Sequence, residues 1–298
     1  MITPPSPPFD SSLAPAGRPT VVLGSTTGPL GSMHAALHTA ALGSFHALDL
    51  DLRSTLLAPS WEHIAPFADE ETIRIRSVWL PTAVTGLARE QRSRRLNAFL
   101  QHGVNGYGLR QVIVPRLLPN DDSGVSIPGL VRHLTKQSNG VIRLAIGVQA
   151  ESLIQEPDHL DRITAIRRSV EEWDLDIALD LTGDISARWE SEAAVAKMLP
   201  RLTLVRLESW VRRDGTVDTS LRGQLAARTI AMLCDQGYTG IISVNPRATS
   251  WLGRASHAAT AAWAELLAQD IQNRYARTSS ISTFNTPTPR RHASPDRP

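Results

Sequence analysis

The 298-residue sequence contains a single cysteine, Cys234, and only two lysines, Lys136 and Lys197. One cysteine excludes a disulfide or a cysteine-based zinc site within the chain. Cys234 lies in the helical pattern LAARTIAMLCDQG, which favours a small buried side chain over a thiol nucleophile. Both lysines fall in or near predicted helices, so neither is expected at a strand end as a Schiff-base lysine.

The sequence also lacks long apolar runs and a large excess of charge of either sign. No run approaches the 18 apolar residues of a membrane span, and the N-terminus lacks the pattern of a secretory signal, so we expect a cytoplasmic protein with no membrane partner. Thirty-one Lys and Arg oppose 29 Asp and Glu. Without a basic run interleaved with aromatics, no nucleic-acid partner is predicted. The sequence leaves open whether the protein forms a homo-oligomer.

The composition of the two ends differs from that of the middle. Residues 1–18 are rich in Pro and Ser, and residues 277–298 combine Ser, Thr, Pro and Arg with little to bury, so both are predicted to be disordered tails. Residues 19–276 are left as one domain, which matches the roughly 250 residues of a (β/α)8 barrel.

Short apolar runs alternate with amphipathic segments through this domain. Eight runs have the length and β-branched content of buried parallel strands: 20–25, 44–52, 73–82, 110–118, 141–150, 175–183, 202–209 and 240–246. The segments between them show helical spacing, as in PDHLDRITAIRRSVEEW, and a last helix follows the eighth run. The sequence therefore predicts an α/β fold, a (β/α)8 TIM barrel, with a doubly wound open sheet as the alternative.

In such a barrel the active site lies at the C-terminal ends of the strands. Three of these ends, ALDLTGD, LVRLES and GIISVNP, resemble the last strands of the xylose isomerase-like barrel superfamily of sugar isomerases and epimerases, which includes endonuclease-IV-type members. The resemblance implies carboxylates and a histidine that hold a divalent metal at the ends of strands five to eight.

Carried over by position, most of that ligand set is replaced. Asp180 matches, but Gln149, Arg206 and Asn245 stand where a Glu, a His and a Glu are expected. A guanidinium is permanently cationic and would repel a divalent ion. We therefore expect no catalytic metal and no other cofactor, and we expect Arg206 to pair with Asp180. A register shift of one or two residues would instead bring Glu151 and Glu208 to the mouth.

Two carboxylate pairs could move protons. Asp180 with Glu208 is one. Asp49 and Asp51 are the other, two apart and on one face of the second strand, although outward exposure or turn capping is the favoured role for them.

Further candidates could bind a ligand at the mouth. Arg116 follows the fourth strand, and the tryptophans after strands three, seven and eight could stack on a sugar or cover the core: Trp79, Trp210 and Trp251. An anion site after strands seven and eight is a weaker hypothesis, built from Arg212, Arg213, Arg247, Thr249, Ser250 and Arg254.

The favoured hypothesis is a barrel with a degraded metal site that binds a sugar-like or anionic small molecule in a non-catalytic or accessory role. The alternative is an active sugar or sugar-phosphate isomerase, epimerase or lyase, in which Arg206 stabilises an oxyanion and Asp180 or Glu208 moves the proton. An endonuclease-IV-type enzyme is the least favoured, because no histidine falls at a strand end.

Overall fold

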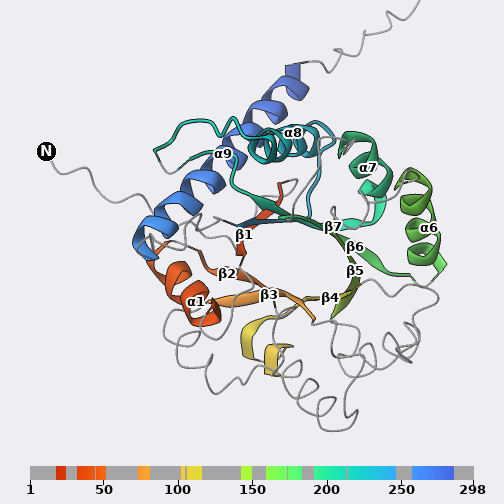
Figure 1. The fold of residues 1–298 in the computed structure, drawn as a ribbon, viewed down its shortest axis with the longest axis horizontal. Coiled ribbons are helices and arrows are strands. Elements are labelled where there is room, and N and C mark those ends of the chain that lie inside the picture. Colours follow the sequence, from red (N-terminus) through yellow and green to blue (C-terminus); the bar gives the residue numbers. More distant parts are fainter. Residues whose placement is uncertain are drawn as a thin grey trace, which may run out of the picture.

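The strands close into a barrel. The computed structural model describes residues 18–24, 32–43, 45–51, 73–80, 102–104, 106–115, 142–149, 159–172, 174–182, 191–212, 214–245 and 257–284. Eight parallel strands follow one another in chain order, and β8 pairs with β1, with Leu23 opposite Val244 (Figure 1). The predicted TIM barrel is confirmed, and the closing pair rules out an open sheet.

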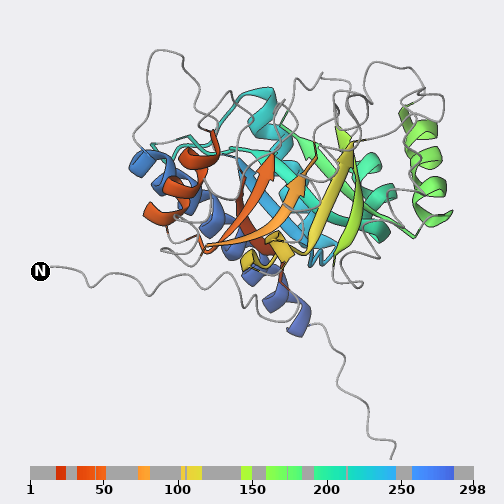
Figure 2. The ribbon, with the colours of Figure 1, turned by 90° about the horizontal axis from the view of Figure 1, so that it is seen from below.

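Each strand lies within one of the eight predicted apolar runs. Their bounds are β1 Thr20–Gly24, β2 Ala47–Asp51, β3 Arg74–Trp79, β4 Gln111–Pro115, β5 Arg143–Gln149, β6 Asp176–Leu181, β7 Leu202–Glu208 and β8 Ile241–Asn245. The side view shows β2 and β3 running toward the same end of the barrel (Figure 2). The C-terminal residues of all eight strands therefore surround one mouth.

Helices pack around part of the outside. They are α1 Ser32–Leu42, α6 His159–Glu172, α7 Ser191–Met198, α8 Leu221–Asp235 and α9 His257–Phe284, with a 3-10 turn at Leu199–Arg201. Contacts join α6 to α7, α7 to α8, α8 to α9, and α9 to α1. Most of the helix predicted after the third run lies outside the described residues. None of the described helices combines the length and apolarity needed to cross a bilayer.

The last helix is longer than expected. The sequence placed the start of a tail at residue 277, whereas α9 continues to Phe284. Its buried residues include Leu267, Ile271 and Tyr275, which lie before that boundary.

The apolar core has two parts. The larger cluster lies between the strands and the helices, and includes Leu48, Val148 and Leu179. A smaller cluster fills the barrel itself and consists of Trp79, Ile113, Ala145, Ala178 and Leu204, with Ile241 packed against it. Small side chains on β5 and β6 thus face larger ones from the other strands, as close packing in a narrow barrel requires.

A bulge in β3 changes which way its residues face. Leu48 pairs with Ile75, but the next residue of β2, Asp49, pairs with Ser77, so Arg76 is an extra residue in β3. Ile75 packs in the outer cluster and Trp79 in the inner one. The bulge therefore turns Ser77 and Trp79 into the barrel, whereas strict alternation from Ile75 would turn both outward.

Candidate functional site

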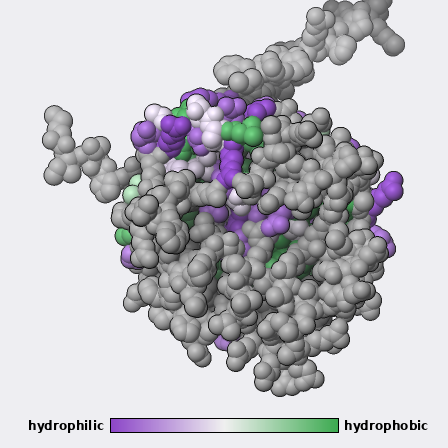
Figure 3. Space-filling view, in the orientation of Figure 1, coloured by the Kyte–Doolittle hydropathy of each residue, from purple (hydrophilic) through white to green (hydrophobic). Residues whose placement is uncertain are grey.

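Polar side chains gather inside the barrel toward the mouth. On β6, β7 and β8 the inner apolar residues are Ala178, Leu204 and Ile241, and the residues two positions later on the same face are Asp180, Arg206 and Ser243. Buried polar or charged residues also include Asp49, Asp51, Ser77, Glu208 and Asn245. Hydrophilic residues are visible at the centre of the face over the barrel (Figure 3).

Asp49 is the hub of this polar interior and is fully buried, with 0% of its surface exposed. One carboxylate oxygen accepts from Ser77 Oγ at 2.6 Å and Trp79 Nε1 at 3.0 Å. The other accepts from Arg206 Nε at 3.0 Å and Ser243 Oγ at 2.8 Å. Four side chains from three other strands thus satisfy one carboxylate, which is what a buried charge requires.

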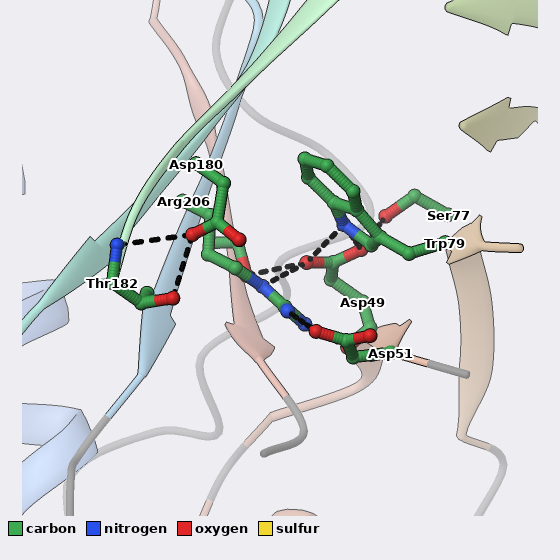
Figure 4. Close-up of polar contacts among 8 residues, drawn as sticks. Asp49, Asp51, Ser77, Trp79, Asp180, Thr182 and Arg206 are labelled. Carbon is green, nitrogen blue, oxygen red and sulfur yellow. Dashed lines mark hydrogen bonds and ion pairs between the residues drawn. The ribbon is translucent and has the colours of Figure 1, made fainter. Parts of the chain in front are cut away.

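Arg206 crosses the barrel from β7 and bridges two carboxylates of β2. Its Nε binds Asp49, its Nη1 binds Asp51, and its side chain is 1% exposed (Figure 4). The guanidinium carbon lies 5.4 Å from the centroid of the Trp79 ring, a cation–π distance. The guanidinium is therefore held by charge on one side and by an aromatic face on another.

One expectation changes here. The favoured outward or capping role for Asp49 and Asp51 is wrong, because both point into the barrel and form ion pairs. Asp49 and Asp51 of β2 are thus counter-ions of Arg206 that the sequence did not predict, because the long guanidinium reaches across the axis. The Cα of Asp180 is opposite that of Arg206 on the neighbouring strand, and the pairing of these two residues stays a prediction.

Asp180 lies at the predicted place, inward and near the C-terminal end of β6, and is 4% exposed. Its Oδ1 accepts from the backbone N–H of Thr182 at 3.0 Å and from its hydroxyl at 2.6 Å (Figure 4). These two bonds fix the orientation of the carboxylate relative to Thr182, the first residue after β6.

Three more predicted residues lie at the same level. Glu208 ends β7, is 8% exposed, and has Arg222 Nη1 from α8 at 3.5 Å. Asn245 ends β8 directly opposite Glu208, and its buried Oδ1 has no hydrogen-bond partner among the residues that the structure describes. Gln149 ends β5 and is exposed. Glu208, Asn245 and Gln149 thus surround the mouth above the buried Arg206.

The two described tryptophans among the candidates do not stand open at the mouth. Trp79 is 2% exposed inside the barrel, where Gly147 leaves room for its ring: a Cβ at Gly147 would lie 2.8 Å from Trp79 Cζ3. Trp210 is 1% exposed in the outer cluster, and its Nε1 donates to Asp270 of α9 at 2.7 Å. Both therefore fill core space, which is one of the two roles considered for these tryptophans.

The remaining candidates lie mostly outside the described residues: Arg116, Glu151, Arg213, Arg247, Thr249, Ser250, Trp251 and Arg254. Arg212 is described and exposed, with Asp218 Oδ1 3.9 Å from its Nε. Cys234 is buried, and burial raises the pKa of its thiol to about 11, so at neutral pH the thiol is a poor nucleophile.

Sequence reasoning missed three members of the network. Ser77 and Ser243 are the only hydroxyl residues inside two apolar runs, RSVWL and IISVNP, and this was the available signal. Arg222, the second residue of α8, carried no signal, because its role depends on how α8 docks beside the end of β7.

No family model and no curated protein matches this chain. Solved structures do. A sugar phosphate isomerase/epimerase from Parabacteroides distasonis ATCC 8503 is 14% identical with a TM-score of 0.56, over 92% of this chain and 99% of the other. D-allulose 3-epimerase from Methylomonas sp., in complex with D-allulose, is 15% identical with a TM-score of 0.55, over 87% and 98%.

A further structure is named a xylose isomerase-like TIM barrel/4-hydroxyphenylpyruvate dioxygenase fusion protein; it is 15% identical with a TM-score of 0.51, over 91% of this chain and 45% of the other. The fold of this chain is similar to that of these isomerase and epimerase barrels. At these identities the likeness concerns the fold alone, and what the barrel does in this chain has to be argued from its own site.

The metal that the xylose isomerase-like resemblance implies does not fit the residues found here. Asp180 matches one of the expected metal ligands. The next expected ligand position, on β7, is occupied by Arg206, whose guanidinium already binds Asp49 and Asp51. Within the described part of the chain, no group of three or more His, Cys, Asp or Glu is placed to hold a metal ion. A permanent cation at the centre and neutral side chains at Gln149 and Asn245 form a poor donor set for a divalent ion.

Proposed function

We propose that the mouth of this barrel binds a neutral, sugar-like small molecule and that the protein serves a non-catalytic or accessory role. The observation that carries this proposal is the buried Oδ1 of Asn245, for which the described part of the chain supplies no hydrogen-bond donor. A buried acceptor left without a donor costs about 1–3 kcal/mol, so it marks a place where a ligand hydroxyl can bind. Glu208 lies directly opposite and offers a second acceptor.

Charge favours a neutral ligand over an anionic one. Toward the mouth, the described interior holds four buried carboxylates, those of Asp49, Asp51, Asp180 and Glu208, while a fifth, Asp176, lies at the start of β6 and pairs with Arg143. Among the described residues, the guanidinium groups of Arg206 and Arg222 face the carboxylates near the mouth. An added phosphate or carboxylate would meet this formal excess of negative charge, while a polyol can donate its hydroxyls to the carboxylates.

The burial of Arg206 favours binding over catalysis. An oxyanion stabiliser has to point donors at the reacting oxygen, but the Nε and Nη1 of Arg206 already donate to Asp49 and Asp51. An active isomerase is the second candidate, supported by the inward placement of Asp180 and Glu208 near the ends of adjacent strands. In that case one of these carboxylates would move the proton.

Binding can be tested by calorimetric titration with neutral ketoses, beginning with D-allulose, and with their phosphates. We expect the neutral sugars to bind more tightly than the phosphates. Asn245→Ala should weaken binding about tenfold, the equivalent of a hydrogen bond worth about 1.4 kcal/mol. Gln224→Ala removes a side-chain amide from an exposed residue of α8 and is the matched control. Equal affinity in the Asn245 variant and the wild type would refute the proposal.

The accessory role can be tested separately by incubating a bound ketose with the protein in D2O. An isomerase or epimerase that moves a proton from the carbon beside the carbonyl returns deuterium from solvent to the sugar, which NMR detects. We expect no incorporation above the protein-free rate. Incorporation that is lost in Asp180→Asn or Glu208→Gln would instead establish the second candidate.

A further inference from the structure

The centre of the barrel is built like a cation site, with the cation supplied by the chain. Carboxylates of Asp49 and Asp51 converge from β2 on one guanidinium, and all three side chains are 1% exposed or less. Hydroxyl oxygens of Ser77 and Ser243 lie around the same carboxylate of Asp49. Two carboxylates with further oxygen atoms are the ligand types that hard divalent cations prefer.

The guanidinium fits this place closely. It donates to both carboxylates, its Nη2 lies 3.5 Å from the carbonyl oxygen of Asp49, and the Trp79 ring is at cation–π distance. Buried carboxylates are strongly unfavourable unless they are paired and hydrogen-bonded. Asp49 and Asp51 therefore need a cation at this point.

We propose that Arg206 is a built-in replacement for a metal ion: its guanidinium neutralises the barrel carboxylates, excludes divalent cations from the wild-type protein, and masks a site that would bind one in its absence. The formal charges agree with this exchange. Asp49 and Asp51 carry two negative charges, which one divalent ion would balance once the single charge of Arg206 is removed.

The exclusion follows from charge and space together. A divalent ion would have to share the two carboxylates with a guanidinium that cannot lose its proton. It would also have to displace the hydrogen bonds that Arg206 makes with both of them. Arg206 is thus a positioning residue for the acidic interior, and this inference does not depend on what the mouth binds.

The test is a titration with Mn2+ followed by electron paramagnetic resonance, in which the signal of free Mn2+ falls as the ion binds. The wild type should leave the signal unchanged. Arg206→Ala should bind about one equivalent, and its melting temperature should rise by several degrees in excess Mn2+. Arg206→Ala combined with Asp51→Asn should bind about tenfold more weakly, because one of two charged ligands is gone.

Several outcomes would overturn the proposal. Stoichiometric Mn2+ in the wild type would show that Arg206 excludes nothing, and a folded Arg206→Ala that ignores Mn2+ would show that no site is masked. If Arg206→Ala yields folded protein only when refolded with Mn2+, the proposal is supported. If it folds under neither condition, Arg206→Lys decides: recovery of folded protein without metal supports the need for a cation, and failure contradicts it. Sugar binding is read from a separate titration.

Discussion

At the residue scale, one carboxylate organises the site. Asp49 receives donors from β3, β7 and β8, so it joins strands that lie far apart in the sequence and on both sides of the barrel. Such a network is stable only when every member is satisfied. It explains why an acidic residue can occupy the middle of a strand that is buried throughout.

Trp210 provides a residue-scale prediction, because the structure places it in the outer core. Trp210→Phe removes the hydrogen bond to Asp270 and part of the buried ring, so the free energy of unfolding should fall by about 2 kcal/mol. Sugar affinity should not change. Urea unfolding and the calorimetric titration check the two quantities.

Trp263→Phe is the matched control, because this tryptophan also lies in the outer cluster and donates from a buried Nε1, to the carbonyl of Val211. Both variants should behave alike. A loss of sugar affinity in Trp210→Phe with none in Trp263→Phe would return Trp210 to the ligand site.

At the scale of the element, the β3 bulge decides whether the site exists. The extra residue Arg76 turns Ser77 and Trp79 inward, where both donate to Asp49. Deleting Arg76 would restore alternation and turn these side chains toward the helices. We expect the deletion variant to be recovered unfolded or aggregated, as judged by circular dichroism and size-exclusion chromatography.

Substitution at the same position separates chain length from side chain. Arg76→Ala keeps the bulge and removes a partly buried guanidinium whose pKa is lowered by burial and by the neighbouring charges of Arg74 and Arg110. Its free energy of unfolding should stay within about 1 kcal/mol of the wild type or rise. A deletion variant as stable as Arg76→Ala would contradict the role given to the bulge.

For the whole molecule, the last helix completes the outer layer. α9 packs against α8 and α1 (Figure 1). Gly43, which follows α1, lets the chain approach the first turns of α9 closely, because a Cβ at Gly43 would lie 2.9 Å from the Cβ of Ala261. The buried side chains of α9 include Trp263, Leu267, Ile271 and Tyr275.

Truncation tests where the domain ends. Removing residues 277–298 spares those four side chains, so the melting temperature should stay close to that of the full chain. Removing residues 257–298 exposes the surfaces they cover, which costs roughly 6–12 kcal/mol, comparable to the whole stability of a typical domain. A large loss in the shorter truncation would show that the end of α9 belongs to the folded unit.

The number and order of the strands were predictable, because buried parallel strands appear as apolar runs at a regular spacing, and the described helices lie where amphipathic segments separate or follow those runs. The positions of Asp180, Arg206 and Asn245 at strand ends followed from the same pattern. The partners did not, because the link from Arg206 to Asp49 joins residues 157 positions apart. The bulge at Arg76 was equally hidden, since a single inserted residue leaves the apolar pattern of IRIRSVWL intact.

The apolar side chains inside the barrel have a kinetic consequence. Ile113, Ala145, Ala178 and Leu204 fill the axis beneath the polar network, and all are 0% exposed. A molecule bound at the mouth must then depart by the route along which it arrived. Two different ligands would share this one entrance to the barrel. They should therefore compete for binding, whatever their chemical differences.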